Sequence, residues 1–112
     1  MNKLLILAFI ASILLVCGFS GCTTKNLDSF ASCVGSKAIL YVQEGCPHCA
    51  DQEKLFGDSL SKLNIIDCKY QPDKCVAEGI QYIPAWDING NKSTGVKSLE
   101  ELSKETGCAL PE

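Results

Sequence analysis

Arginine is absent from this chain of 112 residues, and positive charge of any kind is scarce. Ten lysines and a single histidine stand against thirteen acidic residues, which gives a formal net charge of −3 at pH 7. Nucleic-acid binding normally needs an excess of positive charge, and bidentate phosphate recognition relies on arginine. The sequence also lacks a glycine-rich phosphate loop, internal repeats and low-complexity segments. This composition argues against a nucleic-acid partner.

The first 22 residues have the composition of a secretory leader or membrane anchor rather than of a folded domain. A short positive region at Lys3 is followed by an apolar run over residues 4–16 that only Ser12 interrupts. Extended to residue 19, this run is slightly short for a membrane-spanning helix, which needs roughly 17–25 residues. Small residues then precede Cys22 in a pattern that resembles a lipoprotein processing box. Lipidation at Cys22 and a simple transmembrane anchor are the two alternatives.

The leader divides the chain into three parts. We expect a leader or anchor at 1–22, a tether at 23–29 and one domain at 30–112. In either form the leader predicts an extracytoplasmic, membrane-anchored protein, on the cell-envelope or periplasmic side.

Six cysteines remain after the leader, an even number in a small exported domain, which suggests disulfides. Six cysteines allow 15 pairings. Proximity in sequence pairs Cys46 with Cys49 as a redox pair. It also predicts a second, structural disulfide that closes a short loop. Elimination leaves one further pair, which would join the two ends of the domain. The expected structural disulfides are Cys68–Cys75 and Cys33–Cys108. The alternatives are a second redox relay for the former and two buried, unpaired cysteines for the latter.

The segment Cys46-Pro47-His48-Cys49 lies between an apolar strand pattern at 38–42 and a helical pattern at 50–63. The first cysteine would therefore sit at a helix N-terminus, where unpaired N–H groups and the helix dipole favour a thiolate. Pro47 destabilises the first helical turn little, because the N–H that it lacks would be unpaired there. Protonated His48 adds positive charge near the sulfur. Because the thiolate is the form that attacks disulfides, the segment predicts a thiol–disulfide redox site.

The remaining pattern predicts an α-β-α-β-α-β-β-α order after the leader. Gly35 and Ser36 are expected to end the first helix, and Gly57 to mark a kink. In the helix at 50–63 the apolar residues are expected to face the core and Gln52 to lie mostly outside it. Asn89-Gly90 predicts a hairpin. The expected elements are a helix at 27–34, strands at 37–43 and 64–67, a short helix at 75–78, strands at 85–88 and 91–96, and a helix at 99–106 with a capping box from Ser98 and Glu101.

Together these features resemble the thioredoxin fold, and more closely the thioredoxin-like domains associated with bacterial and plant vitamin K epoxide reductase homologues. The resemblance covers roughly residues 30–108. It is carried by Cys46-Pro47-His48-Cys49, the helix segment 52–57, Cys68 and Cys75, Gly79-Ile80, Ile83-Pro84-Ala85-Trp86, and the segment 95–102. It implies an α/β thioredoxin-like fold, in which helices flank a four-stranded mixed sheet.

The resemblance also implies roles for single residues. Cys46 would be the nucleophile and Cys49 the resolving thiol. The Ile83–Pro84 bond would be cis, and the backbone of Ile83 would pair with an extended substrate. Trp86 is assigned to substrate binding, with core packing as its alternative.

Several positions depart from the resemblance. Gly45 and Ala85 stand where relatives often have an aromatic residue and threonine. Leu40 stands where thioredoxin has a buried acid that assists proton transfer. Glu44 is a candidate proton carrier in its place, and a solvated turn residue is the alternative reading. Because Pro-His resembles the pair in a periplasmic oxidant, we expect an oxidant more than a reductant.

The sequence therefore predicts an extracytoplasmic protein disulfide oxidoreductase that needs no cofactor beyond its own disulfide. Its partners would be protein thiols or disulfides, together with a vitamin K epoxide reductase-like or quinone-linked membrane protein. We expect a monomer. Two other functions remain open: a copper- or zinc-binding lipoprotein using Cys46, His48 and Cys49, and a non-catalytic thioredoxin-like binding module. We assign no metal ligand, because tetrahedral zinc usually has four.

Overall fold

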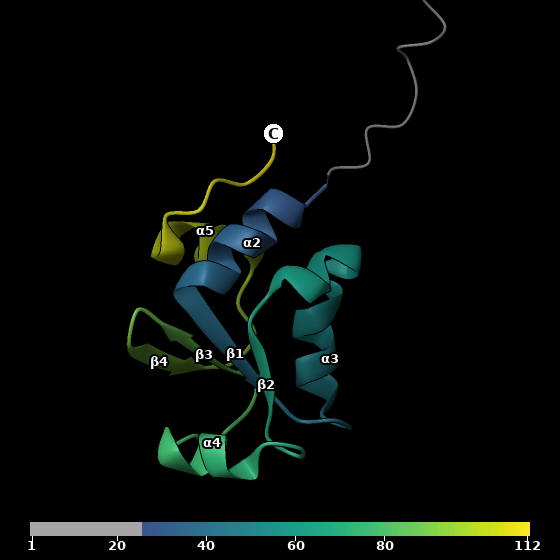
Figure 1. The fold of residues 1–112 in the computed structure, drawn as a ribbon. Coiled ribbons are helices and arrows are strands. Elements are labelled where there is room, and N and C mark those ends of the chain that lie inside the picture. Colours follow the sequence, from purple (N-terminus) through teal and green to yellow (C-terminus); the bar gives the residue numbers. More distant parts are fainter. Residues whose placement is uncertain (1–25) are drawn as a thin grey trace, which may run out of the picture.

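A computed structural model describes residues 26–112, in which helices alternate with strands around a single sheet (Figure 1). The leader, Cys22 and the first part of the tether lie outside the described residues. The elements are α2 (Asp28–Lys37), β1 (Ala38–Val42), α3 (Pro47–Lys54), the 3-10 helix η1 (Gly57–Lys62), β2 (Ile65–Asp67), α4 (Pro72–Ala77), β3 (Ala85–Ile88), β4 (Asn91–Thr94) and α5 (Leu99–Thr106).

The four strands form one mixed sheet in the order β2-β1-β3-β4. β1 runs parallel to β2 and antiparallel to β3, and β3 runs antiparallel to β4. Leu40, in the middle of β1, is paired with Ile65 on one side and Trp86 on the other. The nearly continuous apolar run of β1 is explained by this central position, because both of its faces are covered. The predicted four-stranded mixed sheet with flanking helices is confirmed.

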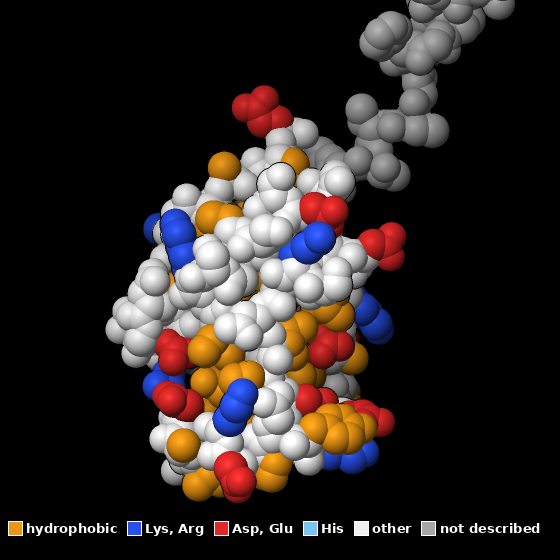
Figure 2. Space-filling model, viewed as in Figure 1, with side chains coloured by type: hydrophobic (Ala, Val, Ile, Leu, Met, Phe, Trp, Pro, Cys, Tyr) orange, Lys and Arg blue, Asp and Glu red, His pale blue; other side chains and the backbone are white. Residues whose placement is uncertain are grey.

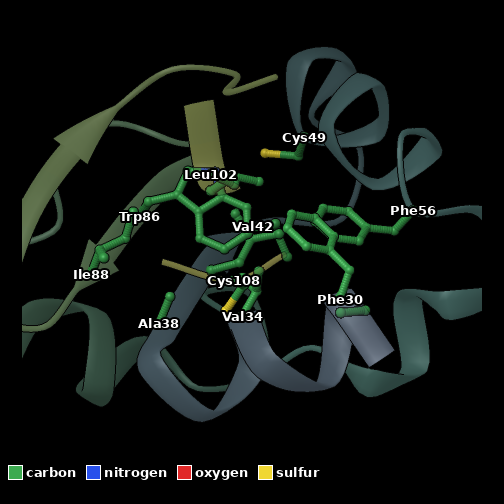
Figure 3. Close-up of a cluster of buried hydrophobic side chains, with 12 residues drawn as sticks. Phe30, Val34, Ala38, Val42, Cys49, Phe56, Trp86, Ile88, Leu102 and Cys108 are labelled. Atoms are coloured by element: carbon green, nitrogen blue, oxygen red, sulfur yellow. The ribbon is translucent and has the colours of Figure 1, made fainter. Parts of the chain in front are cut away.

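The two faces of the sheet are covered by different helices. On one face, a core cluster joins side chains of α2, α5 and the segment after α3 to alternate residues of β1, including Leu40 and Val42. Figure 3 shows the aromatic part of this cluster, in which the ring centroid of Phe56 is 6.1 Å from that of Phe30 and 6.4 Å from that of Trp86. On the other face, Tyr41 packs with Cys75 of α4. The period-two alternation of a strand thus separates the two cores.

The first helix continues past the point at which the sequence predicts that it ends. α2 includes Gly35 and Ser36 and ends only at Lys37. A Cβ atom at Gly35 would lie 2.5 Å from the backbone oxygen of Lys62. Gly35 is therefore needed for the close approach of α2 to the end of η1 rather than for stopping the helix.

The single helix predicted at 50–63 is two helices, because the chain turns at Gly57, whose φ is +52°. The predicted inner face was wrong in detail. Ala50 is exposed and Leu55 is 39% exposed, whereas Gln52 is 0% exposed. Gln52 tolerates burial because both polar atoms of its amide are hydrogen-bonded. Its oxygen accepts from Trp86 Nε1 at 2.9 Å and from Lys97 N at 2.7 Å, and its Nε2 donates to the Lys97 oxygen at 3.0 Å.

The second half of the domain follows its local signals closely. The hairpin at Asn89-Gly90 is confirmed, and both residues have positive φ. The capping box of α5 is confirmed, with Ser98 and Glu101 bonded reciprocally. Some bounds differ from the expectation. α4 spans Pro72–Ala77 rather than 75–78, and it begins early because proline suits a first helical position. β4 ends at Thr94 rather than at residue 96.

On the face seen in Figure 2, acidic and lysine side chains are interspersed, and hydrophobic side chains gather around α4. The charge of this face is mixed rather than of one sign. None of the helices in residues 26–112 has both the length and the apolar character required to cross a membrane.

Candidate active site

Cys46 and Cys49 form a disulfide at the start of α3, with their Cα atoms 5.2 Å apart. Cys46 is the N-cap residue, in extended backbone conformation, and Pro47 occupies the first turn. The N–H of Cys49 donates to Cys46 Sγ over 3.2 Å. This sulfur therefore takes the place that an oxygen of serine or aspartate takes in an ordinary N-cap. A hydrogen bond from an N–H and the positive end of the helix both favour negative charge on Cys46.

The two sulfurs differ in access. Cys46 is half-buried, whereas the side chain of Cys49 belongs to the hydrophobic core and is 2% exposed. Figure 3 shows Cys49 directed from α3 toward this core. Of the two sulfurs, Cys46 is therefore the one that an incoming group can reach more easily.

His48 and Pro47 lie on the outer side of the motif. The side chain of His48 is 79% exposed, and its Nδ1 is 3.7 Å from an oxygen of Asp51. When protonated, His48 would thus share its charge between the nearby sulfur and this carboxylate. Pro47 is exposed and is positioned at the rim of the site.

The Ile83–Pro84 peptide bond is cis, as the resemblance implies. Pro84 is buried, and its oxygen accepts a hydrogen bond from Gly95 N at 2.8 Å. Ile83 is partly buried and packs against both core clusters, and Cys46 packs against the first of them. Within residues 26–112, neither backbone group of Ile83 has a hydrogen-bond partner. Within the described part of the chain, these groups are therefore available for backbone pairing with an extended segment.

The assignment of Trp86 to substrate binding is wrong. Its side chain is 1% exposed, and its indole N–H donates to the buried amide of Gln52. Trp86 packs beside Phe56, with ring centroids 6.4 Å apart. Its role is therefore structural, since its hydrogen bond to Gln52 connects β3 to α3. Figure 3 shows Trp86 among the other buried side chains.

A cavity of about 230 Å³ adjoins the disulfide and is lined by both cysteines and by three carboxylates. The carboxylates belong to Glu44 in the turn before Cys46, Glu53 in α3 and Asp67 at the end of β2. Sequence reasoning did not identify Glu53 or Asp67. The spacing of Cys49 and Glu53, four residues apart in a helix, was a usable signal. The placement of Asp67 depends on the pairing of β2 with β1, which joins Asp67 to Val42.

Glu44 is neither a free proton carrier nor a simply solvated residue. The Tyr70 hydroxyl donates a hydrogen bond to its carboxylate, and Lys69 Nζ lies 3.2 Å from the same oxygen. The hydrogen bonds from Tyr70, chiefly, and from Lys69 hold the pKa of Glu44 below its ordinary value. The same bond raises the pKa of Tyr70. A carboxylate held in its ionised form is a poor proton acceptor.

The two other disulfides join the pairs expected from the sequence. Cys33 of α2 is bonded to Cys108, which follows α5 and is buried, with Cα atoms 5.8 Å apart. Cys68 is bonded to Cys75 of α4, with Cα atoms 5.7 Å apart. The second bond closes the loop that carries Lys69 and Tyr70, and the N–H of Cys68 donates to the Val42 oxygen at 2.8 Å. This loop therefore lies at the same end of the sheet as the redox motif.

In the part of the chain that the structure describes, no three His, Cys, Asp or Glu side chains are placed to hold a metal ion.

Comparison with known proteins identifies the fold. No family model matches this chain. Among solved structures, it is similar to the NTD_N/C domain of the alkylhydroperoxide reductase AhpF from Enterococcus faecalis. The TM-score is 0.50 at 18% sequence identity, over 70% of this chain and 42% of that chain. The fold is thioredoxin-like. An oxidised thioredoxin from Plasmodium falciparum also matches, with a TM-score of 0.48 and 17% identity, over 71% of this chain and 90% of that chain.

The chain spans less than half the length of the AhpF chain that it matches. Identities this low show only the fold. Any activity must therefore be argued from the site itself.

Proposed function

We propose that this protein is a thiol–disulfide oxidoreductase that exchanges disulfides with protein substrates through Cys46 and Cys49. One observation carries the proposal. Cys46 Sγ caps α3 and accepts the N–H of Cys49 at 3.2 Å, and Cys46 is partly exposed while Cys49 is buried. The arrangement supplies one reachable sulfur that is stabilised as a thiolate and one protected sulfur that can only react with its neighbour.

In the oxidising direction, a substrate thiolate attacks Cys46 Sγ, and the bond between Cys46 and Cys49 breaks. Cys49 leaves as a thiolate and takes up a proton. A second substrate thiolate then attacks the substrate sulfur of the mixed disulfide. The substrate disulfide forms, and Cys46 leaves as a thiolate that the helix N-terminus stabilises. The reverse sequence reduces a substrate disulfide with the same residues.

The substrate would bind as an extended segment beside the cis-proline turn. The N–H and C=O of Ile83 have no partner within residues 26–112, and Ile83 and Cys46 pack against the same core cluster. Pairing of a substrate strand with these groups would bring its sulfur to Cys46 with little dependence on sequence.

We place the redox potential toward the oxidising end. The N-cap position and the N–H of Cys49 both stabilise the reduced form at Cys46, and a stabilised reduced form makes a stronger oxidant. The negative charge of Glu44 near Cys46 would weaken this stabilisation of the thiolate. Its influence is reduced because Lys69 forms an ion pair with Glu44. Equilibration of the pair with glutathione tests the direction. A potential nearer about −120 mV than about −270 mV is expected, and a value near −270 mV would identify a reductant.

The setting we propose is extracytoplasmic and membrane-tethered, with a vitamin K epoxide reductase-like or quinone-linked membrane protein reoxidising a monomer. The leader pattern at 1–22 supports this setting. Two further disulfides, Cys33–Cys108 and Cys68–Cys75, also suit an oxidising compartment.

Reduction of insulin and reactivation of scrambled ribonuclease test the activity, with Cys46→Ser as the inactive control. The wild-type protein should catalyse at least one reaction, and the variant neither. Equal rates for the two proteins would exclude the proposed function. A matched control replaces both Cys68 and Cys75 by serine, which removes a disulfide outside the motif and should leave the exchange reaction in place.

A further inference from the structure

In disulfide exchange, Cys49 loses a proton in one direction and regains it in the other. The structure has to provide a route for this proton. Cys49 is 2% exposed and lies in a cluster of apolar side chains. An apolar environment raises the pKa of a thiol, since it disfavours the thiolate. The residues of β1 in the same cluster as Cys49 include Leu40 and Val42 and are all apolar, so this face of β1 supplies no acid or base; Tyr41 lies in the other cluster. The proton acceptor must lie elsewhere.

The cavity beside the disulfide brings Cys49 together with polar groups, because both cysteines and three acidic residues line it. Its volume of about 230 Å³ exceeds the roughly 30 Å³ that a water molecule occupies in the liquid, so water can connect its walls. The ionisable groups that face Cys49 across it come from three elements. They are Glu44 from the turn before α3, Glu53 from α3 and Asp67 from β2.

Two of these carboxylates are already engaged. Glu44 accepts from Tyr70 and pairs with Lys69, and these contacts hold it ionised. Asp67 accepts the backbone N–H of Lys69 at 2.8 Å. Glu53 is half-buried, and its carboxylate has no hydrogen bond or ion pair with any residue in 26–112. Four residues after Cys49 on the same helix, it also lies on the same helical face.

We propose that Glu53 is the proton acceptor and donor for Cys49, acting through water in this cavity. The proposal rests on the proposed function. In the reductive direction, Cys49 gives its proton to the Glu53 carboxylate and attacks Cys46 Sγ as a thiolate. The bond between Cys46 and the substrate sulfur breaks, and the substrate leaves as a thiolate. Glu53 then returns its proton to solvent. In the oxidising direction, Glu53 takes up a proton from solvent and gives it to Cys49 as this sulfur leaves the disulfide.

The resolving step of the full chain tests the proposal with Glu53→Gln. Reduced protein is mixed with oxidised glutathione, quenched with acid and analysed by mass spectrometry, which separates formation of the Cys46 mixed disulfide from its resolution by Cys49. We expect resolution in the variant to be slowed at least about a hundredfold at pH 6, the lower end of the range for general acid–base catalysis. The two rates should converge above about pH 9, where hydroxide can deprotonate Cys49.

The sign of the change separates this role from a purely electrostatic one. Removing a negative charge near Cys49 would favour its thiolate and accelerate resolution at low pH. Unchanged or faster resolution in Glu53→Gln would therefore overturn the proposal. The matched control is Asp58→Asn, which removes a carboxylate from the exposed part of η1, outside the cavity, and should resolve like the wild type.

Formation of the mixed disulfide distinguishes a failure of the proposed function from a failure of the role of Glu53. Formation of the mixed disulfide depends on Cys46 and should proceed equally in wild type, Glu53→Gln and Asp58→Asn, which also shows that the variants are folded. If the wild-type protein formed no mixed disulfide, the proposed function itself would fail. If it formed and resolved one with the same pH profile as Glu53→Gln, only the role of Glu53 would fail.

Discussion

Gln52 shows how one polar residue can hold the site together. Its amide lies at 0% exposure between α3, Trp86 and the backbone of Lys97, and makes three hydrogen bonds. Two of these bonds fix the segment before α5, and the third fixes the indole of the core. Because all three partners are buried or partly buried, their loss would leave groups that water does not replace.

Replacement of Gln52 by leucine should destabilise the oxidised protein by about 2–4 kcal/mol, since the Trp86 N–H and both backbone groups of Lys97 lose their partner. Urea unfolding followed by fluorescence measures this, because Trp86 is the one tryptophan of the chain. The exposed glutamine gives the control: Gln81→Leu should change stability by less than about 0.5 kcal/mol. Similar losses in both variants would contradict the account.

The hydrogen bond between Tyr70 and Glu44 should make the stability of the fold depend on pH. Because the pKa of Glu44 is lower in the folded chain, its ionised form stabilises the fold above the usual glutamate range, about pH 4.3. This contribution is lost as the pH falls through the folded-state pKa. Tyr70→Phe removes the largest cause of the shift, so the pKa of Glu44 should rise and the acid-side loss of stability should become shallower.

Titration of the Glu44 side chain by NMR measures this change, and unfolding as a function of pH measures its effect. Tyr82→Phe is the control, because Tyr82 is exposed and its hydroxyl has no hydrogen-bond partner in residues 26–112. A Glu44 titration that is the same in Tyr70→Phe and in the wild type would disprove the interaction.

At the scale of elements, the contact between α2 and η1 decides how closely the helices pack beneath the site. Gly35 lies against the backbone of η1, and Phe30 of α2 stacks with Phe56, the residue just before η1, with ring centroids 6.1 Å apart. α3 continues into this packed segment through Leu55 and Phe56. The close approach at Gly35 therefore contributes to the position of the helix that carries Cys46 at its start.

Gly35→Ala tests this contact. Alanine would favour a free helix by about 1 kcal/mol, but its Cβ would lie 2.5 Å from the Lys62 oxygen, a backbone atom that cannot rotate away. The net result should be a loss of about 1–2 kcal/mol in urea unfolding. Ser32→Ala, at an exposed position of the same helix, should be neutral or slightly stabilising. Stabilisation by Gly35→Ala would show that the approach is not needed.

At the scale of the molecule, disulfides supply stability that a domain of this size has difficulty in obtaining from its core alone. Cys33–Cys108 joins residues 75 apart and fastens α2 to the segment after α5. Cys68–Cys75 joins residues only 7 apart. A longer closed loop removes more entropy from the unfolded chain, so the two bonds should contribute unequally.

Replacing both Cys33 and Cys108 by alanine should cost about 4 kcal/mol, and replacing Cys68 and Cys75 about 2.5 kcal/mol. Urea unfolding of the two double variants, with their remaining disulfides oxidised, gives the comparison. The reverse order would mean that loop entropy does not govern these bonds.

Local signals made much of this architecture predictable. The Asn-Gly turn, the Ser98 capping box and the strand that precedes Cys46 all depend on neighbours in sequence, and all occur as expected. Gln52 was misplaced because a polar residue in a helix normally faces water. Here its burial depends on a hydrogen bond to Trp86, 34 residues away, whose core packing was the alternative left open by the sequence.

The cavity could not be predicted from the sequence either, because it also depends on contacts between residues that are distant in sequence. Asp67 reaches it only through the parallel pairing of β2 with β1, and Glu44 is held ionised by Tyr70 from a distant loop. The role of Gly35 likewise depends on the backbone of η1 rather than on its own helix.

The most direct test of the central claim is the rate at which Cys46 of the reduced protein is alkylated by iodoacetamide across a pH series. The N-cap geometry predicts a half-maximal rate at least about one pH unit below 8.5, the value of an ordinary cysteine. A half-maximal rate near 8.5 would contradict the account.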